Sequence, residues 1–148
     1  MDAAALYDEL HTITETLSGI MLHTSFHETS ETSFAGKEIY IAQVFFTDAW
    51  QGSLRIITTD TLARILAERI FSDPAYPVTS FEMSEALREI ANITGGNLKN
   101  FLPEGTKLSL PRLDVVAEIP AMHTIITTLH FEAEGEPYRI DLLRGNTQ

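Results

Sequence analysis

The sequence contains no cysteine, and its 148 residues include only 10 Lys and Arg against 21 Asp and Glu. Without thiols the chain has no disulfide, no thiolate nucleophile and no cysteine-based metal site. The formal net charge of −11 argues against nucleic acid as a partner, because phosphate contacts require clustered Lys and Arg. The ordinary interpretation of this acidity is solubility, and the alternative is a partner with a basic or metal-bearing docking face.

Long apolar runs are also missing. No stretch approaches the ~20 apolar residues that span a bilayer. The N-terminal residues lack the basic start and the apolar run of a signal peptide. We therefore expect a cytoplasmic protein with no membrane partner. The length fits one domain over residues 1–148, or two fused half-units.

Several catalytic signatures are absent as well. There is no Gly-x-Ser-x-Gly elbow, and the glycine-rich Thr94–Asn97 has neither the preceding strand nor the Gly-Lys-Ser/Thr ending of a phosphate loop. His23 and His27 have the spacing of metal ligands on a helix, but they lie where a helical pattern ends and no His-Glu-x-x-His pattern exists. We interpret them as surface histidines and expect this chain to bind no metal. Trp50 is interpreted as a packing aromatic.

Hydrophobic periodicity predicts a mixed α and β chain. The expected helices are Asp2–Leu22, Thr61–Phe71 and Ser80–Phe101. The expected strands are Glu38–Thr47, Ser53–Thr58, Lys107–Glu118 with an interruption at Pro111, Thr124–Glu132 and Tyr138–Arg144. The first two strands and the last two strands are expected to form antiparallel hairpins. The order of helix and hairpin occurs twice, and Glu15 and Ser18 repeat the spacing of Glu89 and Asn92, which indicates possible pseudo-duplicated halves.

Local signals set the boundaries of these elements. The Ser- and Thr-rich stretch His23–Lys37 predicts a loop, and Thr59 or Asp60 is expected to cap the second helix. Two prolines in Ser72–Pro77 predict a break in the helical pattern. The Thr-x-x-Glu sequence that begins at Thr79 then predicts a capping box for the third helix.

The helix expected at Ser80–Phe101 has one apolar stripe and an unusual polar face. At about 100° per residue the stripe comprises Met83, Leu87, Ile90, Thr94, Leu98 and Phe101. The opposite face comprises Glu85, Glu89, Asn92, Gly96 and Lys99. Glu89 and Asn92 are three residues apart, so their side chains are neighbours on the exposed face. Gly95 and Gly96 each lower helix stability by about 1 kcal/mol relative to alanine, but they would allow another backbone to come close.

A carboxamide beside a carboxylate has useful chemistry. The Asn92 side chain can donate one hydrogen bond and accept another, which suits it to hold a water molecule in line for attack. The Glu89 carboxylate can pair with a cation on a partner. A solvated helix face is the ordinary interpretation of such a pair. The poor helix propensity of asparagine and the two glycines that follow raise the alternative, a functional role.

Residues Glu85–Lys99 resemble the signature helix of the CheC/CheX/FliY family of chemotaxis phosphatases, with the closest likeness to CheX. Trp50–Arg64 and Leu108–Pro111 also resemble this family. The resemblance implies an α/β (α+β) fold of the CheX and CheC type, with an antiparallel-rich sheet and two long helices on one face. The chain departs from the family at Glu85, where Asp or Ser is usual, and in a short spacing between Asn92 and Pro111.

The same resemblance implies dephosphorylation of the phospho-aspartate of a CheY-like response regulator, in chemotaxis or a related two-component system. Asn92 would orient the attacking water, and Glu89 would pair with the active-site lysine of the regulator. Glu85, Gly95, Gly96 and Lys99 are the expected partner-binding residues. The receiver domain of the regulator would hold the Mg²⁺, and this chain would bind no cofactor.

Family resemblance also implies a homodimer. The alternative function is a non-catalytic CheX-like module that binds or scaffolds a receiver or a flagellar-switch protein. Such a module would bind the phosphorylated receiver without changing the rate at which the phosphoryl group is lost.

Overall fold

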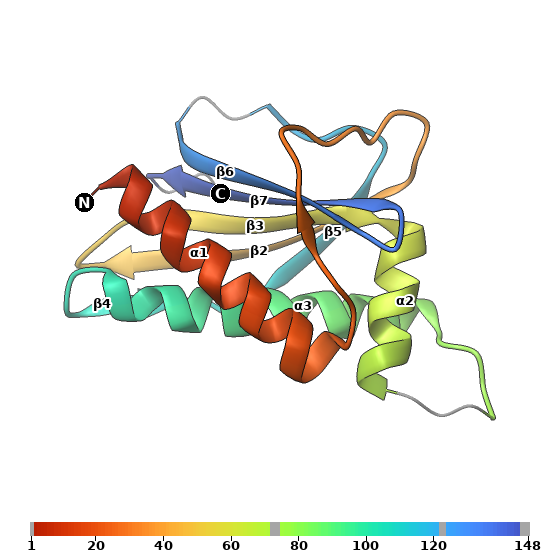
Figure 1. Cartoon of the computed structure of the whole chain (residues 1–148). Coiled ribbons are helices and arrows are strands. Elements are labelled where there is room, and N and C mark those ends of the chain that lie inside the picture. Colours follow the sequence, from red (N-terminus) through yellow and green to blue (C-terminus); the bar gives the residue numbers. More distant parts are fainter. Residues whose placement is uncertain (1, 72–74, 122–123, 146–148) are drawn as a thin grey trace.

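The computed structural model describes residues 2–71, 75–121 and 124–145 and forms helices packed on one antiparallel sheet (Figure 1). The helical elements are α1 Ala3–Leu17, the π-helix Ser18–Leu22, α2 Asp60–Phe71, α3 Ser80–Leu98 and the 3₁₀ turn Lys99–Phe101. The strands are β1 His27–Glu28, β2 Ile39–Asp48, β3 Gly52–Thr59, β4 Thr106–Leu108, β5 Arg112–Val116, β6 Ile125–Ala133 and β7 Glu136–Arg144.

Both predicted hairpins are confirmed, and so is the interruption at Pro111. β2 pairs with β3, and β6 pairs with β7. Glu134 and Gly135 join β6 to β7 with φ values of 53° and 76°, as in a two-residue hairpin turn with two left-handed residues. The predicted connection was too long, because Pro137 already belongs to β7. Pro111 lies between β4 and β5, both of which pair with β2.

The sheet order is β1-β6-β7-β3-β2-β4, with β5 also paired to β2. The hairpins of the two halves meet at the centre, where β3 pairs with β7. At one edge β1, from the first half, pairs with β6 of the second. At the other edge β4 and β5, from the second half, pair with β2 of the first. The order of strands therefore reads the same from both edges, as expected for pseudo-duplicated halves.

Alternation along the strands separates the sheet into two faces. On β2, Tyr40, Ala42, Val44 and Phe46 belong to the main core together with residues of α1, α2 and α3. The intervening Ile39 and Ile41 belong to a smaller apolar cluster with Phe34 and Ile57 on the other face. In Figure 1, α1 and α3 lie across the same face of the sheet, which agrees with the predicted two long helices on one face.

The boundaries of the first two helices follow the sequence closely. The predicted first helix is confirmed, but its last five residues, Ser18–Leu22, form a π-helix. The predicted loop that follows contains the two-residue strand β1. Thr59 is the residue that caps α2, because its Oγ1 accepts a hydrogen bond from the Leu62 amide at 3.2 Å. Part of the predicted break at Ser72–Pro77 lies outside the described residues.

The capping box at the start of α3 is confirmed. The Glu82 amide donates to Thr79 Oγ1 at 3.1 Å, and the Thr79 amide donates to Glu82 Oε1 at 3.0 Å. These two bonds satisfy backbone donors that would otherwise be unpaired in the first turn. The N-terminal end of α3 is therefore held firmly in place.

Gly95 allows α3 to lie close to the sheet. It is buried, and a Cβ atom built on it would lie 2.8 Å from Val44 Cγ2 and 3.2 Å from Leu108 Cδ1. The prediction of Gly95 as a partner-binding residue is therefore corrected, because the surfaces that approach it are those of β2 and β4. Gly96 differs, since a Cβ atom built there would have nothing within 4 Å.

Phe101 is a second correction to α3. The helix gives way to a 3₁₀ turn at Lys99, so the 100° step no longer holds for the last predicted member of the apolar stripe. Phe101 is 50% exposed, whereas the other five members are buried. Their burial over four turns orients the rest of the helix.

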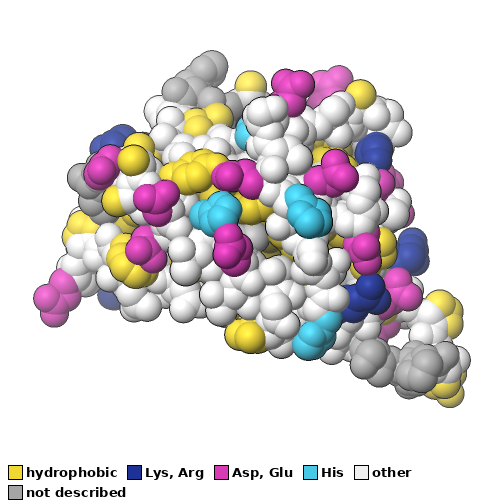
Figure 2. All heavy atoms as spheres, in the orientation of Figure 1, with side chains coloured by type: hydrophobic (Ala, Val, Ile, Leu, Met, Phe, Trp, Pro, Cys, Tyr) yellow, Lys and Arg dark blue, Asp and Glu magenta, His cyan; other side chains and the backbone are white. Residues whose placement is uncertain are grey.

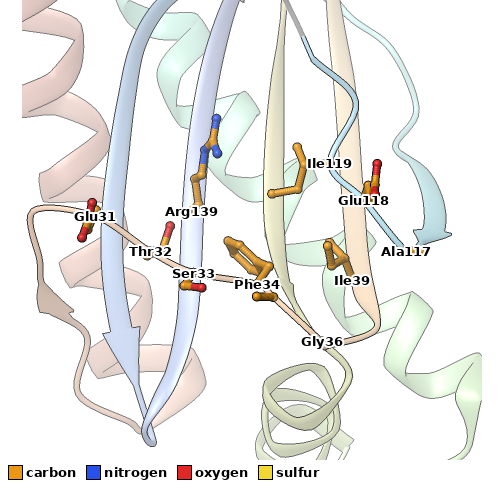
Figure 3. Close-up of a pocket in the computed structure, with 11 residues that line it drawn as sticks. Glu31, Thr32, Ser33, Phe34, Gly36, Ile39, Ala117, Glu118, Ile119 and Arg139 are labelled. Atoms are coloured by element: carbon orange, nitrogen blue, oxygen red, sulfur yellow. The ribbon is translucent and has the colours of Figure 1, made fainter.

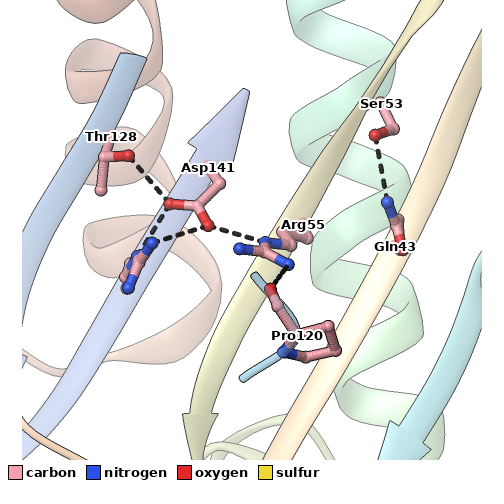
Figure 4. Close-up of polar contacts among 7 residues, drawn as sticks. Gln43, Ser53, Arg55, Pro120, Thr128 and Asp141 are labelled. Carbon is pink, nitrogen blue, oxygen red and sulfur yellow. Dashed lines mark hydrogen bonds and ion pairs between the residues drawn. The ribbon is translucent and has the colours of Figure 1, made fainter. Parts of the chain in front are cut away.

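A buried charge cluster lies on the sheet face opposite the helices (Figure 4). Asp141 Oδ2 accepts from Arg55 Nε at 2.6 Å and from Arg139 Nη2 at 3.1 Å. Asp141 Oδ1 accepts from Thr128 Oγ1 at 3.0 Å and from Arg139 Nε at 2.8 Å. Arg55 also donates through Nη1 to the Pro120 carbonyl at 2.9 Å. One carboxylate thus joins β3, β6 and β7 and compensates two buried or half-buried guanidinium groups.

We expect Asp141→Asn to lower the free energy of unfolding by about 3–5 kcal/mol, because it leaves two arginines without their buried counter-charge. The measurement is urea unfolding of wild type and variant at the same pH. Asp114→Asn is the matched control, since its ion pair with Arg112 at 3.6 Å is exposed and should change stability by less than about 0.5 kcal/mol. Equal shifts in the two variants would contradict the role given to the cluster.

Substitution of the adjacent glycines Gly95 and Gly96 by alanine should change the free energy of unfolding in opposite directions. Gly95→Ala should lower the unfolding free energy by about 1 kcal/mol, since overpacking against the stiff Val44 side chain outweighs the gain in helix propensity. Gly96→Ala should raise it by about 0.5–1 kcal/mol, because the added methyl group enters open space. Thermal and urea unfolding of both variants measure the effect, and stabilisation by Gly95→Ala would contradict the packing described.

Candidate functional site on the outer face of α3

Glu89 and Asn92 lie on the outer face of α3, as the sequence predicted. Both are exposed, while Ile90 and Ala91 between them are buried against the sheet. Among the described residues, neither the Glu89 carboxylate nor the Asn92 carboxamide has a hydrogen-bond or ion-pair partner. Two neighbouring polar groups are thus held on a rigid helix with their full hydrogen-bonding capacity available.

The other polar side chains of α3 provide a contrast. Asn97 Nδ2 donates to the Ile93 carbonyl at 2.8 Å, so this second exposed asparagine is partly committed to its own helix. Glu85 Oε1 accepts from Arg88 Nη1 at 2.8 Å, so the carboxylate at the position that departs from the family is already paired. The polar face therefore contains one uncommitted carboxylate and one uncommitted carboxamide, side by side.

Arg88 is a site-face residue that the sequence interpretation missed. It is half-buried, and its pairing with Glu85 places a guanidinium one turn before Asn92. The three-residue spacing of Glu85 and Arg88 is a recognisable ion-pair signal on a helix and could have identified it.

Gly96 and Lys99 extend the same face beyond Asn92. Gly96 is half-buried with open space above its Cα, and Lys99 is exposed at the point where α3 ends. The three predicted partner-binding residues other than Gly95 are thus all accessible from outside. Together with Glu89 and Asn92 they lie along one side of α3.

The related positions on α1 do not reproduce this arrangement. Glu15 is exposed, but the Ser18 hydroxyl donates to the Glu15 carbonyl at 2.7 Å. Ser18 also begins the π-helix. The Ser18 hydroxyl is committed to the backbone, and Glu15 Oε1 lies 2.9 Å from His11 Nδ1. Of these two pairs of described residues, only Glu89 and Asn92 are uncommitted.

Other candidate chemistries find little support. Within residues 2–71, 75–121 and 124–145, no group of three or more His, Asp or Glu side chains could hold a metal ion. His23 and His27 are both exposed, His23 beyond the π-helix and His27 in β1. In the same residues, no helix is both long enough and apolar enough to cross a membrane. Trp50 packs edge-to-face on Phe46 with ring centroids 5.7 Å apart, which confirms its packing role.

A pocket of about 650 Å³ lies on the opposite face of the sheet and does not belong to this site. Figure 3 shows Phe34, Ile39 and Ile119 among its lining residues, with Arg139 at one side. Two donors of the Arg139 guanidinium are engaged by Asp141. The sheet separates this pocket from α3.

On the face that carries α1, negative charge is spread rather than gathered at one place. Figure 2 shows Asp and Glu side chains scattered over the face that carries α1, with few Lys and Arg between them. The charge of −11 therefore marks no single docking patch on that face. The local arrangement on α3 is more informative than the overall charge.

Comparison with known proteins identifies a family and similar folds for this chain. The family model described as chemotaxis phosphatase CheX matches residues 40–124, which is more than half of the chain and includes all of α3. No curated protein sequence matches the chain.

Solved structures share the fold over nearly the whole chain. CheX from Vibrio vulnificus has 14% identity and a TM-score of 0.76, with 97% of this chain and 98% of that chain covered. CheX from Desulfovibrio desulfuricans has 12% identity and a TM-score of 0.72, covering 95% and 99%. A CheX–CheY–BeF3–Mg²⁺ complex from Borrelia burgdorferi has 17% identity and a TM-score of 0.65, covering 95% and 96%.

Proposed function

This chain belongs to the CheX family of chemotaxis phosphatases, and from that membership we propose that it dephosphorylates the phospho-aspartate of a CheY-like response regulator. The observation that carries the proposal is the uncommitted pair Glu89 and Asn92, exposed on a rigid helix inside the matched segment. The complex of CheX with CheY from Borrelia burgdorferi supports a CheY-like partner.

Asn92 acts on the attacking water. Its carbonyl oxygen accepts a hydrogen bond from the water while its amide group donates to the phosphoryl group, which fixes the water opposite the scissile bond. Positioning of this kind supplies much of the catalysis in phosphoryl transfer, where the protein makes few covalent contributions. The capped and buried helix provides the rigidity that such positioning requires.

The reaction balances without a covalent intermediate on this chain. The water oxygen forms a bond to phosphorus as the bond between phosphorus and the aspartyl oxygen breaks. The electron pair of the broken bond stays on the aspartate, which leaves as a carboxylate. The proton released by the water passes to the phosphate product.

Glu89 acts on the partner. Its carboxylate pairs with a cationic side chain beside the receiver's phospho-aspartate. This ion pair orients the receiver and neutralises the charge of that cationic side chain. Mg²⁺ belongs to the receiver in this proposal and neutralises charge on the phosphoryl group. Glu85, Gly96 and Lys99 contact the receiver around this centre. The family resemblance further predicts that the protein acts in the cytoplasm as a homodimer.

We expect Asn92→Ala to reduce the stimulated rate of phosphate release by at least about 100-fold, because the water loses its orienting group. The assay follows phosphate release from phosphorylated CheY-like receivers of the same organism, with Mg²⁺ and catalytic amounts of the chain. Asn97→Ala is the matched control on the same helix, since its amide is committed to the Ile93 carbonyl. It should retain most of the activity.

The outcomes separate the proposal from its alternative. Equal acceleration by wild type and Asn92→Ala would remove Asn92 from the water-positioning role. If the wild-type chain binds the phosphorylated receiver without shortening its lifetime, the non-catalytic binding module is correct. If no receiver is bound or dephosphorylated, the proposed function is wrong.

Glu89→Gln should act mainly through KM. It removes the charge that pairs with the receiver but leaves Asn92 in place, so we expect kcat/KM to fall about 10-fold with a smaller change in kcat. The salt dependence of KM should also become weaker, because one intermolecular ion pair is lost. Glu132→Gln, an exposed change on β6, is the control. An unchanged KM and an unchanged salt dependence in Glu89→Gln would contradict this role.

A further inference from the structure

Phe81 is an exposed aromatic residue in the first turn of α3. It is 69% exposed, although Met83, two positions later, is fully buried in the core. Single exposed apolar side chains are common on protein surfaces and require no explanation by themselves. Phe81 is significant because of its position on α3 relative to Glu89 and Asn92.

Phe81 lies on the same side of α3 as the polar pair. At about 100° per residue, Phe81, Glu85, Arg88, Glu89 and Asn92 fall within a sector of about 100°. With a rise of about 1.5 Å per residue, Phe81 lies about 12 Å along the helix from Glu89 and about 17 Å from Asn92. The Glu85–Arg88 ion pair occupies the space between the aromatic ring and the polar pair.

These distances match the footprint of a protein partner. A standard interface buries about 800 Å² on each side, which corresponds to a disc with a radius of about 16 Å. A receiver centred on Glu89 and Asn92 would therefore cover Phe81 as well. Aromatic side chains are enriched among the residues that contribute most to such interfaces.

The backbone of Phe81 is already ordered before any partner binds. Phe81 lies between Thr79 and Glu82 in the sequence, within the turn that is closed by the reciprocal hydrogen bonds of these two residues. Only the side-chain torsions of Phe81 remain to be fixed on contact. A pre-ordered aromatic residue loses little conformational entropy when it binds, which makes it an effective anchor.

We propose that Phe81 is a docking residue that selects the receiver, an inference that rests on the phosphatase function proposed above. It fits a phosphorylated receiver domain that presents an apolar side chain about 12–17 Å from its phospho-aspartate. Phe81 touches neither the water nor the phosphoryl group. It therefore sets the affinity for the receiver and the choice between receivers, while Asn92 sets the rate of the chemical step.

The test measures catalysis and binding in parallel for Phe81→Ala, Phe81→Leu and wild type. Phe81→Ala should raise KM about 10-fold and weaken binding to a receiver loaded with beryllium fluoride and Mg²⁺ by a similar factor, with kcat within about twofold. Phe81→Leu keeps apolar area and should recover most of the loss. Ile125→Ala is the control, because Ile125 is an exposed apolar residue of β6, and β7 and β3 separate β6 from β2, on which α3 packs.

Each outcome addresses one proposal. If Phe81→Ala matches wild type in both KM and receiver affinity while Asn92→Ala is inactive, the docking role is wrong and the phosphatase function stands. A fall in kcat for both Phe81 variants, with a lowered unfolding temperature, would show a structural role and would also overturn it. If wild type accelerates no receiver, the phosphatase function fails, and receiver affinity alone then decides whether Phe81 docks a partner.

Discussion

The close contact between α3 and strands β2 and β4 is the constraint on which the candidate site depends. Val44 and Leu108 approach Gly95 so closely that no larger side chain fits without movement. This contact sets both the depth of the helix and its rotation about its own axis. Because residues at 100° intervals turn together, burial of one side fixes the direction of Glu89 and Asn92 on the other. The polar face is thus positioned by packing that occurs entirely beneath it.

Much of the fold was predictable because its signals are local. Both hairpins, the capping box and the outward direction of Glu89 and Asn92 follow from periodicity and turn chemistry. The assignment of Gly95 to a partner failed because adjacent glycines differ by a 100° rotation and carry no side chain that shows which one is buried. The cluster at Asp141 also escaped prediction, since its partner Arg55 is brought to it by pairing between β3 and β7, which are far apart in the sequence. Such pairing depends on the whole sheet.

The candidate site on this chain consists of only two uncommitted polar side chains, Glu89 and Asn92. The chain offers a carboxylate and a carboxamide in exposed, water-accessible positions on one helix. Isolated polar groups on a helix surface are weak catalysts in water, because solvent screens their fields and competes for their hydrogen bonds. They become effective only when a second surface closes over them and excludes water. In the proposed function the receiver supplies this enclosure together with the phosphoryl group.

The reciprocal edge pairing of the sheet has a consequence for the ancestry of the fold. Each half gives its short strands to the hairpin of the other half, so neither half completes its own share of the sheet. This is the arrangement that two identical short chains would form by exchanging strands, and that fusion of their genes would preserve. Two equivalent helices would then have been present at the outset. After such a fusion only one of the two helices would need to keep a free polar pair, and the Ser18 hydroxyl, just after α1, is committed to the Glu15 carbonyl.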